Sequence, residues 1–287
     1  MDDNISLKEI IFKTEKFVSK NYKNPKITLQ LLQDFMEDDL NNTVNIFSSS
    51  SSKSLIFLTK NNAYKLMDHI KIDSELKYSS DCNKLIEYNK EALPLKINCE
   101  EFFTICIKDI LINPDINIIK YEKLKQAKPP KKLKKILILL FQMAIALKQI
   151  HKNGYKHSDV YLSNIGLRSK NEYVLYDFEL AKKLDDKYFN EEMYKDVEMF
   201  LEDLIRIYTE NNLEENKTLI ENILDYLKNK YVHDSGKTKK IGRREVKIYD
   251  YTYKINSFIK LLSKLIKEYQ NNNNIINIIS YIKKIKI

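Results

Sequence analysis

Glycine is scarce in this chain, with four glycines among 287 residues and none before Gly154. Glycine-rich loops bind phosphate because the absence of a Cβ lets the backbone approach closely, so the first half of the chain excludes such a loop. The three cysteines, Cys82, Cys99 and Cys106, show no CxxC spacing. A sparse, odd set of this kind is typical of reduced intracellular thiols and argues against a disulfide framework.

Long hydrophobic runs are also missing. The longest, residues 136–147, has 12 residues, whereas a helix that spans a bilayer needs about 20. The first ten residues, MDDNISLKEI, are acidic and lack the apolar segment of a secretory signal. These absences predict a soluble intracellular protein with no membrane span.

Charge is unbalanced toward the basic side, with 49 Lys and Arg against 40 Asp and Glu and a formal charge of +9. A basic surface favours phosphate-bearing or acidic partners. Lys, Asn and Ile are abundant throughout, as in proteins from AT-rich genomes, so we expect the excess lysine to be spread over the surface. Nucleic-acid binding is therefore the less favoured interpretation. Its best place would be residues 237–247, which we expect to form an exposed loop.

The N-terminal part changes pattern near residue 44. Residues 5–40 have helical periodicity, whereas short β-prone runs follow. Asn tolerates the positive φ of a two-residue turn, so residues 55–67 are predicted to form a hairpin that turns at Asn61-Asn62. We expect a helix over 81–93. Two more strands are predicted at 102–107 and 116–121.

A long amphipathic helix is predicted after Pro129-Pro130, since proline favours helix starts. Gly154 ends this helix. Its apolar face holds Ile136, Leu139, Leu140, Met143, Leu147 and Ile150. Beyond residue 190 the whole chain is expected to be helical, over 193–210, 215–230, 253–269 and 274–285.

This order of elements predicts an α+β, two-lobed protein. Its parts would be an N-terminal helical extension (1–43), a small β-rich N-lobe (44–122) and a helical C-lobe (123–287). The composition, 43% apolar, is sufficient for one large domain or for two lobes that share a core.

Polar residues cluster in KHSDVYLSNI, residues 156–165, and Asp177 follows the next hydrophobic run. Phosphoryl transfer from ATP needs a carboxylate to orient the attacking hydroxyl, and Asp159 suits that role. It also needs oxygen ligands for Mg²⁺, a hard cation, for which Asn164 and Asp177 are suited. His157 is expected to be a buried hydrogen-bonding residue of the scaffold, and Phe178 a packing residue.

A cation for the ATP phosphates is also required, and Lys65 in the segment AYKLM is the candidate. An acidic residue on the following helix would hold this lysine. Glu87 is the first choice, with Glu91 and Glu75 as alternatives.

The serine run SSSSSK, residues 48–53, stands where a phosphate-binding loop is needed. Ser49 and Ser50 would offer hydroxyl and backbone N–H groups to phosphate. The alternative is a polar hairpin tip that binds nothing.

Together these segments resemble the catalytic core of the eukaryotic-like protein kinase superfamily. HSDVYLSN stands for the family's H-R-D-L-x-x-x-N, DFE for D-F-G and AYKLM for V-A-I-K, over roughly residues 44–210. The resemblance implies the bilobal kinase fold, ATP with Mg²⁺ or Mn²⁺, and transfer to Ser or Thr hydroxyls of a protein substrate. It implies catalytic roles for Asp159, Lys65 and Asn164. In YKDVEMFLEDL, Asp196 would brace the catalytic loop by accepting its backbone N–H groups.

The stretch between DFE and the Asp of YKD is short, spanning residues 180–195, and the helix before the loop contains FQMA. These features resemble the divergent kinases of large DNA viruses, of the poxvirus late virion kinase type. That resemblance implies a viral protein located in the host cytoplasm or the virion.

Departures from the family pattern keep two further functions open. Ser158 replaces the loop Arg, which argues against control by phosphorylation of the activation segment. Tyr161 replaces a Lys beside the γ-phosphate, and Glu179 replaces the Gly of D-F-G, as in choline and aminoglycoside kinases. A small-molecule kinase is therefore one alternative. A pseudokinase scaffold is the other, because the glycines are missing. Candidates for the missing cation are Lys156, Lys182 and Lys183.

Overall fold

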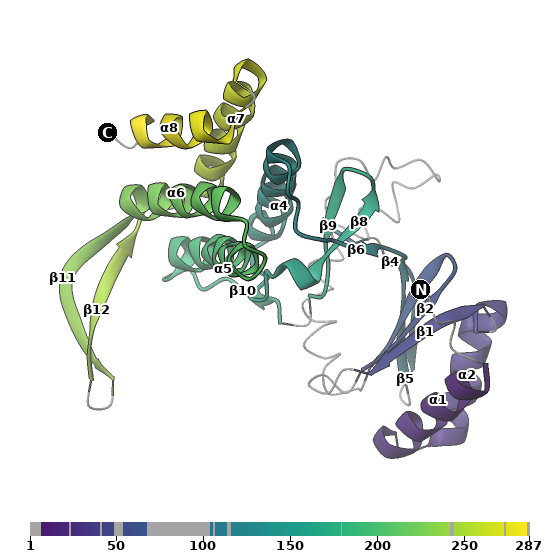
Figure 1. The fold of residues 1–287 in the computed structure, drawn as a ribbon. Coiled ribbons are helices and arrows are strands. Elements are labelled where there is room, and N and C mark those ends of the chain that lie inside the picture. The colour runs from purple at the N-terminus through teal and green to yellow at the C-terminus, as the bar shows by residue number, and fades with distance from the viewer. Residues whose placement is uncertain are drawn as a thin grey trace. The chain divides into compact units, whose positions relative to one another are not determined.

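The computed structural model describes residues 7–22, 24–40, 42–48, 54–67, 104–105, 107–113, 116–178, 180–241, 244–272 and 274–285. The protein is α+β, as predicted: an N-terminal antiparallel sheet precedes a mostly helical region with small sheets. The chain forms two compact units (Figure 1). The first holds the described residues up to Met67 and those of 105–124; the second holds Thr104 and the chain from Lys125 on.

The first unit contains a five-stranded antiparallel sheet in the order β1-β2-β3-β5-β4. Its strands are β1 (Thr43–Ser48), β2 (Leu55–Thr59), β3 (Asn62–Met67), β4 (Ile107–Asn113) and β5 (Ile116–Glu122). Side chains of β2 alternate between buried and half-buried, which is typical of a sheet with one face against a core.

Helices α1 (Leu7–Asn21) and α2 (Pro25–Met36) confirm the helical periodicity of residues 5–40 and share one hydrophobic core with the sheet (Figure 1). This core includes Ile10, Val18, Leu32, Met36, Phe57, Tyr64, Leu66 and Ile118. After α2, the 3₁₀ turn Glu37–Asp39 places the Asp39 carboxylate within 2.5 Å of the Tyr64 hydroxyl and 2.6 Å of Asn62 Nδ2. Both contacts tie the end of the helical segment to β3.

The predicted hairpin at 55–67 is confirmed as β2–β3, but the turn was misplaced by one residue. Residues Lys60 and Asn61 lie between the strands, whereas Asn62 is a strand residue that pairs with Glu122 of β5. The backbone N–H of Asn62 also donates to Thr59 Oγ1 at 3.0 Å. This local bond closes the turn one residue earlier than the Asn-Asn pair indicated.

Of the other predicted elements in this part of the chain, the strand over 116–121 is confirmed by β5. Of the predicted strand over 102–107, residues 102, 103 and 106 lie outside the described residues. Thr104 forms an isolated bridge with Leu175, and β4 begins at Ile107 and pairs with β5 from Ile107 to Asn113. The predicted helix over 81–93 lies outside the described residues.

The second unit begins with β6 (Lys125–Gln126), followed by α4 (Leu133–Lys152), which starts just after the proline pair as predicted. All six residues of its predicted apolar face are buried. Gly154 follows the helix at φ +83°, a left-handed conformation that glycine adopts without a steric penalty. The end of this helix therefore sets the direction in which the polar loop leaves it.

Four more helices complete the second unit: α5 (Phe189–Glu210), α6 (Glu214–Tyr231), α7 (Ile255–Asn271) and α8 (Ile275–Ile285). Helix α4 packs on α7, α5 on α6, and α8 on α6. Small sheets flank them: β7 (Tyr155–Lys156) pairs with β10 (Lys182–Lys183), and β6 pairs with β8 (Ile165–Ser169), which pairs with β9 (Glu172–Leu175).

The region beyond residue 190 is not entirely helical, so this prediction was wrong. Strands β11 (Val232–Ile241) and β12 (Arg244–Tyr251) form a hairpin that projects from α6, where residues 237–247 were expected to be a loop (Figure 1). No side chain of this hairpin is buried among those that the structure describes, so the sequence lacks the alternation by which half-buried strands are predicted. Cross-strand pairs such as Lys247–Asp234, 2.8 Å apart, stabilise it.

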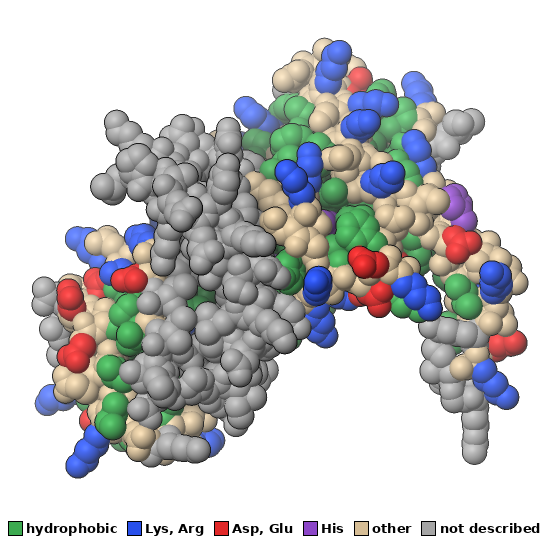
Figure 2. Space-filling view, turned by 180° about the vertical axis from the view of Figure 1, so that it is seen from behind, with side chains coloured by type: hydrophobic (Ala, Val, Ile, Leu, Met, Phe, Trp, Pro, Cys, Tyr) green, Lys and Arg blue, Asp and Glu red, His purple; other side chains and the backbone are tan. Residues whose placement is uncertain are grey.

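Within the described residues, no helix is long and apolar enough to cross a bilayer. Figure 2 shows Lys and Arg side chains dispersed among uncharged and hydrophobic ones on the face in view. This distribution fits the expectation that the excess lysine is spread over the surface.

Candidate active site

One buried carboxylate holds the start of the polar loop. Asp196 of α5 is 2% exposed. Its Oδ2 accepts the backbone N–H of His157 at 2.8 Å, and its Oδ1 accepts that of Ser158 at 2.9 Å. His151 Nε2 lies 2.9 Å from the same Oδ2. A buried carboxylate is stable only among such donors, and these bonds confirm the predicted bracing role of Asp196.

His157 is a buried scaffold residue, as predicted. It is 0% exposed, and its Nε2 lies 3.1 Å from the carbonyl oxygen of Tyr176. Its ring centroid is 4.9 Å from that of Phe178. Burial lowers the pKa of His157, against the opposing effect of Asp196 and other nearby carboxylates. The ring is therefore a neutral imidazole, and Nε2–H donates to the carbonyl.

Backbone strain lies directly before the predicted catalytic residue. Ser158 has φ +66°, a left-handed conformation that costs about 1–2 kcal/mol for a residue with a Cβ. The bond from its N–H to Asp196 offsets this cost. The strained residue and its buried partner together fix the backbone from which the Asp159 side chain extends.

Asp159 and Asn164 are joined by hydrogen bonds. Asn164 Nδ2 donates to Asp159 Oδ2 at 2.7 Å and to the Asp159 carbonyl oxygen at 2.9 Å. Asn164 is 9% exposed, whereas Asp159 is half-buried. The amide nitrogen of Asn164 thus orients the carboxylate, and its Oδ1 is the atom with which it could bind a metal ion.

The β8–β9 hairpin brings the third residue to the same place. Ile165 pairs with Leu175, and the Tyr176 N–H donates to the Asn164 carbonyl oxygen at 3.0 Å. Asp177 follows immediately, half-buried and at φ +64°. Asp177 therefore follows directly after Tyr176, the residue whose backbone N–H binds Asn164.

This donor set fits a magnesium ion. Asn164 and Asp177 offer hard oxygen donors, and Mg²⁺ is typically bound through one or two protein groups together with substrate phosphates. A site of this type needs no protein cage. The described residues contain no group of three or more His, Cys, Asp or Glu that could hold a metal.

Lys65, the predicted phosphate-binding cation, belongs to the first unit. It lies in β3 between Ile56 of β2 and Ile119 of β5, and it is 7% exposed. A lysine so far buried requires anionic or hydrogen-bonding partners. This burial distinguishes Lys65 from an ordinary surface lysine of a strand.

Several predicted site residues lie outside the described residues. They are Ser49 and Ser50, Glu87 with its alternatives Glu91 and Glu75, and Glu179. Their assignments remain predictions.

The kinase family has a Lys where this chain has Tyr161, and three other lysines were the candidates to replace its charge. All three, Lys156, Lys182 and Lys183, lie in the β7–β10 pair. Lys156 forms an ion pair with Glu192 of α5, whereas Lys182 and Lys183 are exposed. The Lys156 charge is thus already partly neutralised. Tyr161 itself is 38% exposed.

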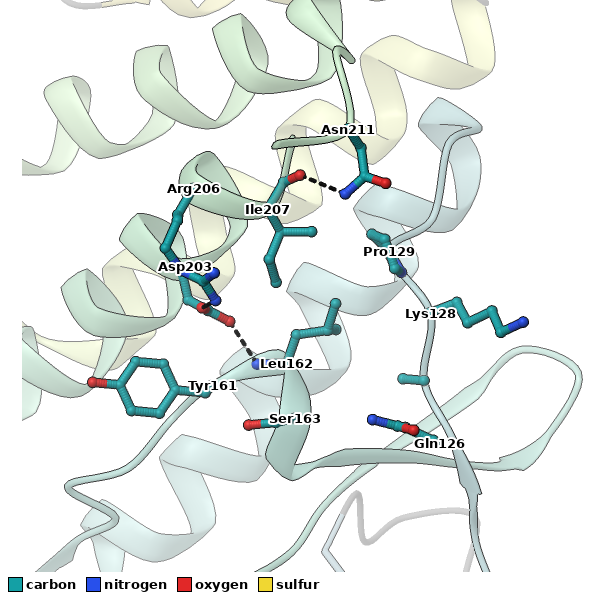
Figure 3. Close-up of a pocket in the computed structure, with 11 residues that line it drawn as sticks. Gln126, Lys128, Pro129, Tyr161, Leu162, Ser163, Asp203, Arg206, Ile207 and Asn211 are labelled. Carbon is teal, nitrogen blue, oxygen red and sulfur yellow. Dashed lines mark hydrogen bonds and ion pairs between the residues drawn. The ribbon is translucent and has the colours of Figure 1, made fainter. Parts of the chain in front are cut away.

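Asp203 is a residue that sequence reasoning missed. Its side chain is 1% exposed, and its Oδ2 accepts the Leu162 N–H at 2.8 Å (Figure 3). It follows Asp196 by seven residues, two helical turns, and so lies on the same face of α5. A second acid on the buried face of this helix was the signal that could have identified it.

The sequence matches no protein-family model and no curated protein. The site is therefore interpreted from its own geometry.

Proposed function

We propose that this protein catalyses ATP- and Mg²⁺-dependent phosphoryl transfer to Ser or Thr hydroxyls of proteins, in a bilobal kinase-like fold. The observation that carries the proposal is the hydrogen-bonded link from Asp159 through Asn164 to the backbone beside Asp177. It joins a carboxylate to two oxygen donors of the kind that phosphoryl transfer requires.

Asp159 is the group that would orient the acceptor. Asn164 Nδ2 donates a hydrogen bond to its Oδ2, and this bond fixes the orientation of the carboxylate. In the proposed reaction the acceptor oxygen bonds to the γ-phosphorus, the bond from that phosphorus to the β,γ-bridging oxygen breaks, and the hydroxyl proton passes to Asp159. ADP and the phosphorylated hydroxyl are the products.

Asn164 Oδ1 and the Asp177 carboxylate would hold the metal ion, which supplies charge neutralisation for the phosphates. Lys65 would be the cation for the phosphates, and its 7% exposure distinguishes it from an ordinary surface lysine.

Two carboxylates of helix α5 would support the reaction through the backbone of the loop. Asp196 and Asp203 accept backbone N–H groups at the two ends of the loop segment 157–162. Preorganised groups of this kind lower the cost of reaching the reactive geometry.

The test is a transfer assay with γ-labelled ATP, Mg²⁺ or Mn²⁺, and a mixture of acidic and basic proteins. We expect acid-stable label on Ser and Thr. A panel of small alcohols is assayed in parallel. Label on an alcohol alone would replace the proposal by a small-molecule kinase. Thermal stabilisation by nucleotide with no label on any acceptor would replace it by a nucleotide-binding scaffold.

A further inference from the structure

A pocket of about 410 Å³ lies beside the loop that carries Asp159. Three segments of the second unit line it (Figure 3): the stretch before α4, the 3₁₀ turn after Asp159, and the C-terminal half of α5. Tyr161 and Ser163 border it two and four residues after Asp159. An acceptor segment held at Asp159 would therefore extend past this pocket within a few residues.

The lining is rich in hydrogen-bond donors and has one carboxylate, Asp203. Both oxygens of that carboxylate are engaged: Oδ2 accepts the Leu162 N–H, and Oδ1 accepts Arg206 Nη2 at 2.6 Å. Asp203 is also buried. The pocket consequently lacks an accessible acid with which to bind a basic side chain.

Arg206 is one of two cations that line the pocket, with Lys128, and 59% of its side chain is exposed. Asp203 holds one side of its guanidinium, and the exposed Glu210 accepts from Nη1 at 2.8 Å. These bonds use two of the five N–H donors of the guanidinium, which leaves three for a ligand. Both side chains of the Arg206–Glu210 ion pair are exposed. Ion pairs of this kind are weak, so Glu210 competes only weakly with a ligand for the guanidinium.

The uncharged polar groups of the pocket suit the same kind of ligand. Ser163 and Gln126 are exposed and contribute a hydroxyl group and an amide, whereas the Tyr161 ring extends away from Gln126 in Figure 3. Lys128 also borders the pocket, although in Figure 3 its side chain extends away from Leu162. Hydroxyl, amide and guanidinium donors around one space are complementary to carboxylate or phosphate oxygens.

We propose that this pocket binds an acidic or phosphorylated side chain of the protein substrate, close in sequence to the accepting Ser or Thr, and that Arg206 is the residue that selects it. The proposal rests on the proposed kinase activity for its biological meaning. Its binding chemistry rests only on the pocket and is testable without turnover.

The first experiment measures transfer to alanine-based peptides that carry one Ser acceptor. Glu, phosphoserine, Lys or Ala is placed at each neighbouring position in turn. We expect kcat/KM to be about tenfold higher with Glu or phosphoserine than with Ala at one position, through a lower KM. The ratio of Glu to phosphoserine then distinguishes an acidic site from a phosphorylated one.

Two variants assign the preference to Arg206. Arg206→Gln should remove it, and Arg206→Lys should retain part of it, since lysine keeps the charge but lacks the planar fork. Glu210→Gln leaves Asp203 and its bonds in place and should strengthen the preference. The matched control is Lys217→Gln on α6, which removes a cation whose pairs with Glu214 and Glu221 are likewise local and should change nothing.

The second experiment measures binding of the fluorescently labelled Glu, phosphoserine and Ala peptides to wild type and Arg206→Gln without nucleotide. Transfer with no acidic preference would overturn the pocket proposal and leave the kinase proposal intact. Binding that depends on Arg206, with no transfer, would support the pocket and contradict the kinase proposal. Neither transfer nor Arg206-dependent binding would overturn both.

Discussion

Asp196 and Asp203, two buried carboxylates on one face of α5, determine the course of the loop that carries Asp159. Each accepts backbone N–H groups of that loop. Hydrogen bonds to a buried charge contribute about 1.5–3 kcal/mol each, enough to hold Ser158 in its strained conformation. The loop is therefore fixed by the helix beneath it rather than by its own local preferences.

His157 provides a pH-dependent test at this scale. Because burial lowers its pKa from the ordinary 6.5, the unfolded chain takes up a proton at higher pH than the folded protein does. The stabilisation is complete above about pH 6.5 and is lost as pH falls toward the folded pKa. His157→Gln should cost about 1–3 kcal/mol at pH 8, and the difference from wild type should shrink below pH 6.5.

The measurement is urea unfolding of both proteins from pH 8 to pH 5. Carboxylates near the ring, Asp196, Asp177 and Asp159, are present in both proteins, so the difference isolates the histidine. The control is His233→Gln on the exposed part of β11, which should change the free energy of unfolding at pH 8 by less than about 0.5 kcal/mol. A His157→Gln difference that grows on acidification would contradict the buried neutral imidazole.

At the residue scale, Asp159, Asn164 and Asp177 were selected from their order around one hydrophobic run. The structure joins Asn164 to Asp159 by a hydrogen bond, and Asp177 follows Tyr176, whose N–H donates to the Asn164 carbonyl oxygen. Asp203 was missed because its partner, the Leu162 N–H, is distant in sequence. Every residue except proline has a backbone N–H, so the sequence does not show which of them a buried carboxylate will accept.

At the scale of elements, burial decided which predictions succeeded. Helix α4 was predicted from six apolar residues, and all six are buried. Strands β11 and β12 have no buried side chains among their described residues. Cross-strand pairing, which sets their register, has no periodic pattern that a reader of the sequence would detect.

The distal part of this hairpin should therefore contribute little to stability. Replacing residues 235–248 by Asn-Gly keeps the paired bases of β11 and β12 and introduces a favoured two-residue turn. We expect the free energy of unfolding to change by less than about 1 kcal/mol, because isolated hairpins are only marginally stable. Urea unfolding at neutral pH measures this change.

Tyr251, at the base of the hairpin, is the matched contrast. Its ring centroid lies 5.6 Å from that of Tyr194, and its carbonyl oxygen accepts Asn190 Nδ2. Tyr251→Ala should cost about 1–3 kcal/mol through the lost ring packing. A larger loss from the truncation than from this single change would show that the distal strands pack against other parts of the protein.

At the scale of the whole molecule, the sequence predicted the α+β class because the helical and strand periodicities occupy different regions. It left open what the N-terminal helices do. In the structure, α1 and α2 complete the core of the first unit, since one face of the sheet needs a cover. Helical periodicity predicts that a face is buried but not which surface covers it.

The central claim is that the second unit carries a phosphoryl-transfer site organised around Asp159. The most direct experiment measures two quantities on one preparation of Asp159→Asn: the rate of phosphoryl transfer from ATP and the affinity for nucleotide. We predict a loss of at least about a hundredfold in rate, with nucleotide affinity within about threefold of wild type. Asp186→Asn, a change in an exposed loop acid, should retain both. Undiminished transfer by Asp159→Asn would contradict the account.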